Sequence, residues 1–201
     1  MKKSLVASLL AVTAFSIAAP AAQASTIVFA GELSGAAEVP PNASPGSGPV
    51  LVSLDTFAHT LQVQTTFSGL LGTTRNAHIH CCTASPGAGV AGVATTTPSF
   101  VGFPLGVTSG AFDQTYDLTL DASWNPSFIA AHGGTTSGAE AFLTSGMLAG
   151  ESYFNIHTSL FRGGEIRSFL EVDRVIPEPG TVGLLGLGAG AIFVALRRRR
   201  R

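Results

Sequence analysis

The sequence predicts an all-β fold, an antiparallel sandwich or barrel with one or two short helices. Thr, Val, Gly and Pro are frequent, a composition that favours short strands joined by turns. Residues 60–68 alternate between two sets of side chains, as expected for a strand with one buried face. About seven strand-like segments follow one another with turn-forming stretches between them, a pattern typical of sandwiches and barrels.

The expected elements can be placed in order along residues 25–174. Strands are expected at 26–33, 50–55, 60–68, 74–82, 116–121, 152–158 and 165–172. Short helices are expected at 124–132 and 138–148, and Gly146 weakens the second because glycine is a poor helix former. Residues 35–49 and 83–110 are expected to be loops. The second loop is unusually long, and long loops often carry function.

The first 24 residues are typical of a secretory signal peptide. A basic start precedes an apolar run at residues 5–19, and Ala22-Gln23-Ala24 supplies the small-x-small pattern before the cleavage point. The run has about 15 residues, fewer than the roughly 20 that a membrane-spanning helix needs. We therefore expect signal peptidase to remove residues 1–24 and the protein to be exported.

The C-terminal residues combine a structural break, an apolar helix and a basic end. Pro177-Glu178-Pro179 interrupts regular structure, residues 181–196 carry no charge, and Arg197–Arg201 close the chain. A helix over 181–196 would span roughly 24 Å, slightly less than the hydrocarbon core of a bilayer. Basic residues favour the cytoplasmic side, so the preceding domain would lie outside the inner membrane.

These three parts, in this order, resemble the PEP-CTERM sorting tail, with residues 175–201 as the tail and 181–196 as its transmembrane helix. The resemblance implies a Gram-negative bacterium, a membrane-anchored precursor and an exosortase, a membrane protease that cuts near Pro-Glu-Pro. It also implies delivery to the outer envelope, cell surface or extracellular matrix, with exopolysaccharide or surface proteins as candidate partners. Whether the tail is cleaved or kept as a plain anchor stays open here.

The domain between the two ends, residues 25–174, is long enough for a real core and is acidic. The whole chain has a net charge of −1, but seven of its eleven basic residues lie at the ends. The domain has no lysine, and its net charge is −7, from four arginines and eleven acidic residues. Such a surface repels phosphate backbones and attracts cations, so we expect no nucleic-acid partner.

Four motifs within the domain resemble the CHRD domain, a module found in secreted proteins. In chain order they are Glu38-Val39-Pro40-Pro41, Asn76-Ala77-His78-Ile79-His80, Tyr153-Phe154-Asn155-Ile156-His157-Thr158 and Gly163-Gly164-Glu165-Ile166-Arg167. The resemblance implies an immunoglobulin-like sandwich or barrel, in a family whose biochemical function is not established. The chain departs from the family at Cys81-Cys82, where members often have a glycine.

His78 and His80 are the first candidate metal ligands. They lie two residues apart on an expected strand, so both imidazoles point to one face, while Ala77 and Ile79 face the core. Two imidazoles on one face can share a metal ion, and imidazole suits Cu, Zn, Ni or Fe. The sequence therefore predicts a candidate Cu or Zn site, with simple hydrogen bonding of the two histidines as the alternative.

Cys81, Cys82 and His157 are the other candidate ligands. A thiolate next to the histidines would strengthen a site for a soft metal. Adjacent cysteines are poorly placed to bridge each other without strain, so we expect no disulfide framework. His157 shares its strand face with Tyr153 and Asn155, and it would complete a three-histidine site if the sheet brought it close.

Two further pairs of residues carry weaker expectations. His59 and His132 lie in expected loops and should be ordinary surface residues. Glu165 and Arg167 share a strand face, and we expect them to form an exposed ion pair of little energetic weight.

Standard catalytic motifs do not occur in the sequence, which has no G-x-S-x-G elbow, phosphate loop or H-E-x-x-H. We therefore expect no enzyme. The leading hypothesis is an exported cell-surface or matrix protein that acts by binding, through adhesion, matrix assembly or metal capture. One alternative is a copper-dependent redox enzyme resembling superoxide dismutase, although the Asp and His residues of its zinc site are not evident. The other alternative is a purely structural surface module.

Overall fold

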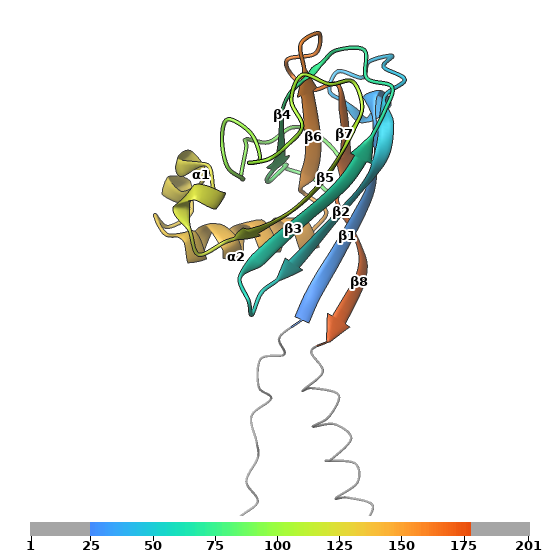
Figure 1. The fold of residues 1–201 in the computed structure, drawn as a ribbon. Helices are drawn as coiled ribbons and strands as arrows, with labels where there is room; N and C mark the ends of the chain where they lie inside the picture. Colours follow the sequence, from blue (N-terminus) through green and yellow to red (C-terminus); the bar gives the residue numbers. More distant parts are fainter. Residues whose placement is uncertain (1–24, 178–201) are drawn as a thin grey trace, which may run out of the picture.

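A computed structural model describes residues 25–177, which form one antiparallel eight-stranded sheet curled into a half-barrel (Figure 1). The strands are β1 (Ser25–Ser34), β2 (Ser47–Asp55), β3 (Thr60–Phe67), β4 (Thr74–His80), β5 (Gly110–Asp117), β6 (Tyr153–Thr158), β7 (Ile166–Phe169) and β8 (Glu171–Pro177). The helices are α1 (Pro126–Ala131) and α2 (Thr136–Leu148), with short 3-10 turns at Gly35–Ala37 and Asp121–Ser123. The predicted all-β antiparallel fold with two short helices is confirmed.

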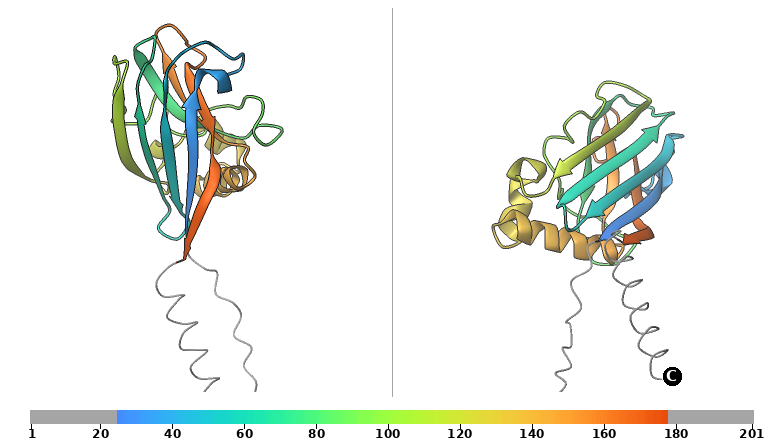
Figure 2. Two further views of the ribbon diagram at one scale, coloured as in Figure 1. Left: turned by 90° about the vertical axis from the view of Figure 1, so that its right-hand side faces the viewer. Right: turned by 60° about the horizontal axis from the view of Figure 1, so that its bottom comes forward.

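The strand order is β4-β6-β7-β1-β2-β3-β5, and β8 pairs with the first part of β1 (Figure 2). The predicted signal peptide at 1–24 and the predicted transmembrane helix at 181–196 lie outside the described residues. Within residues 25–177, no helix is long and apolar enough to cross a membrane.

One face of the sheet carries the hydrophobic core because apolar residues recur at every second position of the strands. Each fully buried side chain of this kind contributes roughly 1.5–3 kcal/mol relative to an exposed one. In β1, β2 and β3 these residues are Ile27, Phe29, Leu33, Val50, Val52, Leu54, Leu61, Val63 and Phe67. In β4 and β6 they are Ala77, Ile79, Phe154 and Ile156.

The long segment between β4 and β5 bridges the two outer strands of the sheet. Its backbone follows β4: the N–H of Ala94 donates to the carbonyl of Ile79 (2.9 Å), and that of Phe100 donates to the carbonyl of Ala77 (3.2 Å). The Phe100 ring lies 6.0 Å from that of Phe112 in β5. β4 is an edge strand, so its outward backbone groups have no neighbouring strand to pair with. The loop supplies hydrogen-bond partners for these groups.

The helices cover one end of the half-barrel, where α2 runs across the lower end of the sheet in Figure 1. Leu143 and Met147 of α2 are buried in the core. Gly146 lies on the same helix, and a Cβ added there would overlap the sulfur atoms of Cys81 and Cys82. The glycine that weakened the helix prediction is therefore required by close packing.

Three boundaries differ from the expectation. The single strand expected at 165–172 is two strands, β7 and β8, because the chain passes from pairing with β6 to pairing with the first part of β1. β8 continues through Pro177, which lies opposite Ser25, so the sheet runs beyond the expected domain end at residue 174. The strand expected at 116–121 is β5, which starts earlier because it pairs along the whole of β3.

Candidate metal centre

The candidate ligands lie on the face of β4 and β6 that points away from the hydrophobic core. The two strands are antiparallel neighbours, with His78 opposite Asn155, His80 opposite Tyr153, and Asn76 opposite His157. Alternation along each strand therefore gathers these polar side chains on one face. Ala77 and Ile79 are fully buried on the other face, as predicted.

His78, His80 and His157 come together on this face. Each offers one ring nitrogen, and these three atoms lie within 4.8 Å of one another. The ring centroids are 5.4 to 5.8 Å apart. Zn–N bonds of about 2.0–2.1 Å place tetrahedral ligands roughly 3.4 Å apart, so nitrogens 4.8 Å apart would have to approach by about 1.4 Å to share one ion.

The other ring nitrogen of each histidine is held by a backbone carbonyl. A carbonyl oxygen only accepts hydrogen bonds, so the contacting nitrogen must carry the proton and donate. The tautomer is thereby set, and the remaining nitrogen keeps a free lone pair, an arrangement common among metal-bound histidines. The three bonds are His78 Nε2 to Pro98 O (2.7 Å), His80 Nδ1 to Ala91 O (2.9 Å) and His157 Nδ1 to Arg162 O (3.0 Å).

The free lone pairs on this face are buried without partners. In the part of the chain that the structure describes, six buried side-chain atoms lack a hydrogen-bond partner, and five lie on this face. Burying polar atoms without partners costs free energy, and a cluster of acceptors can be satisfied by a cation or by water. The five atoms are Asn76 Oδ1, His78 Nδ1, His80 Nε2, Asn155 Oδ1 and His157 Nε2.

Burial also keeps the imidazoles neutral. It lowers the pKa of His78 and of His80 to about 4, and it lowers the pKa of His157 as well. A charged imidazolium is poorly solvated inside the protein, which is the cause of all three shifts. The neutral ring is the form that binds a metal.

A buried ion pair supports one side of the cluster. The ring of Tyr153 stacks on that of His80, with centroids 4.7 Å apart. The Arg167 guanidinium carbon lies 4.7 Å from the centroid of the Tyr153 ring. Arg167 Nε is 3.9 Å from Glu38 Oε2, and the other oxygen, Oε1, accepts a hydrogen bond from Asn155 Nδ2 (3.0 Å). Burial raises the pKa of Glu38 to about 7, while Arg167 opposes that rise.

The expectation of an exposed Glu165–Arg167 ion pair is wrong. Both side chains are buried, and Arg167 is paired with Glu38 instead. The Glu165 carboxylate accepts hydrogen bonds from Ser44 Oγ (2.6 Å) and Thr158 Oγ1 (2.6 Å), and also from two backbone N–H groups. Glu165 therefore ties surrounding loops to the sheet. The resemblance motifs contain Glu38 and Arg167, but only the fold brings the two together.

Cys81 and Cys82 are not part of the histidine cluster. They are joined in a disulfide, although adjacent cysteines are poorly placed to bridge each other, and this bond ties no separate elements of the fold together. Their sulfur atoms face Gly146 of α2 rather than the three histidines. Bonded sulfur offers no thiolate, and the cluster therefore consists of histidines alone.

His59 and His132 stand apart from the cluster as well. His59 is exposed, and its Nδ1 contacts Glu140 at 2.9 Å. His132 is half-buried and stacks on Phe142, with ring centroids 3.7 Å apart. Of the predicted sorting motif, Pro177 ends β8, whereas Glu178 and Pro179 lie outside the described residues.

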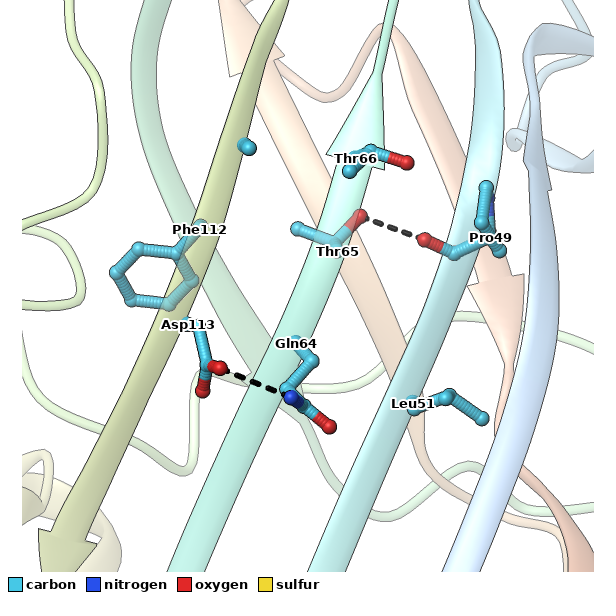
Figure 3. A pocket seen from close by; sticks show the side chains of 8 residues that line it. Pro49, Leu51, Gln64, Thr65, Thr66, Phe112 and Asp113 are labelled. Carbon is cyan, nitrogen blue, oxygen red and sulfur yellow. Dashed lines mark hydrogen bonds between the residues drawn. The ribbon is translucent and has the colours of Figure 1, made fainter.

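A separate pocket of about 530 Å³ lies over β2, β3 and β5 (Figure 3). It shares no residue with the histidine cluster. Its one ionisable side chain, Asp113, already accepts hydrogen bonds from Gln62 (2.8 Å) and Gln64 (2.9 Å). The pocket therefore lacks free polar groups of the kind that the histidine face gathers.

Family models match both the domain and its C-terminal tail. The family model of the CHRD domain matches residues 29–170, and that of the PEP-CTERM protein-sorting motif matches residues 175–201. The comparisons with curated proteins and with solved structures found no match. The sorting motif implies export, a membrane-anchored precursor in a Gram-negative bacterium and processing by exosortase. Because the first match spans most of the chain and contains all three histidines, the protein belongs to the CHRD-domain family.

Proposed function

We propose that this exported protein acts by binding one Cu or Zn ion through His78, His80 and His157. One observation carries the proposal: the three histidines each bring a ring nitrogen within 4.8 Å of the others, and each ring has one buried nitrogen without a hydrogen-bond partner. The opposite nitrogen of each ring is held by a backbone carbonyl, so the rings are oriented before any ion arrives.

The donor set selects the class of ion. Neutral imidazole suits Zn and Cu, whereas Ca²⁺ and Mg²⁺ take oxygen ligands. Three protein ligands leave a further position for water or another ligand, as in open zinc sites. Asn76 Oδ1 and Asn155 Oδ1, which lack donors, can accept hydrogen bonds from a metal-bound water. The proposed role is capture of the ion outside the inner membrane, not catalysis.

The test is calorimetric titration of the full chain, purified in a non-ionic detergent, with Zn²⁺ and with Cu²⁺. We expect one ion per chain. Replacing both His78 and His80 by Ala should abolish binding, and His157→Ala should weaken it at least about tenfold, the loss of one of three ligands. His59→Ala removes a histidine outside the cluster and should bind like the wild type.

Circular dichroism shows whether each variant folds, and His157→Gln provides a milder replacement if the alanine variants do not. If the folded double variant binds as tightly as the wild type, the proposal fails. It fails equally if the wild type binds neither ion at neutral pH, and the purely structural role then stands. Copper-loaded protein that dismutes superoxide would favour the enzyme alternative instead.

A further inference from the structure

A second pocket adjoins the histidine cluster. It has a volume of about 230 Å³ and is lined by Arg75, Asn76, His157, Thr158 and Arg162. His157 belongs to both sites, since it is one of the three clustered histidines and also lines the pocket. No acidic side chain lines this pocket.

The two arginines of the pocket have no acidic partners. Within residues 25–177, neither Arg75 nor Arg162 lies within 4.0 Å of a carboxylate, whereas Arg167 is near Glu38 and Arg174 contacts Asp173. Residues 25–174 have a net charge of −7 and only four arginines. Acidic partners are therefore plentiful in the domain, and yet two guanidinium groups without one line the same small pocket.

Local structure explains how the arginines reach this place. Arg75 lies at an irregularity in the pairing of β4 with β6, between Thr74 and Asn76. Arg162 lies in the turn between β6 and β7, and its carbonyl accepts the hydrogen bond from His157 Nδ1 at 3.0 Å. The turn that orients a candidate metal ligand therefore also supplies a cationic wall of the pocket.

We propose that this pocket binds a small oxyanion, a carboxylate or an inorganic oxyanion, beside the metal. The planar guanidinium group presents paired N–H donors that match such anions. The pocket has room for roughly seven water molecules, at about 30 Å³ each, which is enough for one small oxyanion.

The coupling of the two sites rests on the proposed metal centre. A cation held by His157 adds positive charge next to the pocket, so the metal-loaded protein should bind the anion more tightly than the metal-free protein. By linkage, the anion should tighten metal binding by the same factor.

The experiment is calorimetric titration of the full chain in non-ionic detergent with sodium sulfate and, in parallel, with sodium acetate. Ionic strength is held constant, and zinc-loaded and metal-free protein are compared. We expect saturable binding of one anion. Replacing Arg75 and Arg162 together by Gln should weaken it about tenfold or more, because two charge-assisted contacts are lost. Arg174→Gln, which removes an exposed arginine elsewhere, should change nothing.

The double glutamine variant keeps the backbone carbonyl at position 162, which orients His157, and should still bind zinc. Loss of anion binding in this variant can therefore be told apart from loss of zinc binding. Failure of both anions to saturate the zinc-loaded wild type overturns the anion site and leaves the metal centre intact. Equal anion affinity of the double variant and the wild type overturns it as well. If the wild type binds no zinc but still binds sulfate through the two arginines, the pocket is supported and the metal proposal alone fails.

Discussion

The buried carboxyl group of Glu38 is a residue-level feature that links stability to pH below neutrality. Glu38 and Arg167 are both almost fully buried, 5% and 3% exposed, on the side of the cluster next to Tyr153. Burial raises the pKa of Glu38 to about 7, whereas an unfolded glutamate titrates near 4.3. The folded protein therefore holds this proton more tightly than the unfolded chain does.

We predict that Glu38 contributes a fall in the free energy of unfolding as pH rises from about 4 to 7, opposite in sign to the rise that the lowered pKa values of the three histidines contribute below about pH 6.5. Stabilisation from the raised pKa is fully present below the unfolded value and is lost as pH rises through about 7, by up to roughly 3 kcal/mol. Glu38→Gln should remove this fall, so that its free energy of unfolding gains on that of the wild type as pH rises, whereas the exposed Glu32→Gln should leave the pH dependence unchanged. Urea unfolding of the metal-free protein across this range measures the slopes. Equal slopes for the wild type and Glu38→Gln would exclude the assignment.

At the scale of the elements, the contact between α2 and the Cys81–Cys82 pair gives a clear mutational test. Alanine usually stabilises a helix relative to glycine by about 1 kcal/mol. At Gly146 we predict the opposite sign, because the new Cβ would overlap both sulfur atoms. Gly146→Ala should lower the free energy of unfolding by about 1–3 kcal/mol, as overpacking does. Denaturant unfolding checks this, with the exposed Ser145→Ala in the same helix as a neutral control.

Much of the element structure could be predicted because alternation is a local signal. The pattern at residues 60–68 gave β3, and the spacing of His78 and His80 gave their common face. The pairing of β4 with β6 joins residues far apart in sequence, so the meeting of His157 with the other two histidines could only be stated as a condition. The passage from β7 to β8 has no local signal either, since it depends on which neighbour each strand meets.

The carbonyl groups that orient the histidines could not be predicted from the sequence either. They belong to Ala91, Pro98 and Arg162, and every residue has a backbone carbonyl, so nothing in those side chains marks the role. The cysteines illustrate the opposite case. Their position next to the histidines suggested a ligand role, but the fold turns their sulfur atoms toward α2.

At the scale of the whole molecule, the two ends of the described chain leave the sheet together. Ser25 at the start of β1 lies opposite Pro177 at the end of β8, and both ends emerge at the lower edge in Figure 1. The sorting motif matched at residues 175–201 therefore begins within the sheet itself. The domain and the membrane-directed tail are joined without an intervening linker in the described residues.

We predict that the protein recovered from the cell surface lacks residues 1–24 and the segment after about Pro179, because signal peptidase and exosortase act on the two ends. Glu178→Ala, or deletion of residues 197–201, should leave an uncut form in the inner membrane. Mass spectrometry of the surface protein identifies both termini. An intact C-terminus at Arg201 would contradict cleavage and leave a plain membrane anchor.

The proposed metal centre depends on features at all three scales: single ring nitrogens, the pairing of β4 with β6, and export of the protein. X-ray absorption spectroscopy of the zinc-loaded full chain tests it most directly. The account predicts a coordination shell with three imidazole nitrogens at about 2.0 Å and no sulfur. A shell with sulfur at about 2.3 Å, or one of oxygen alone, would contradict it.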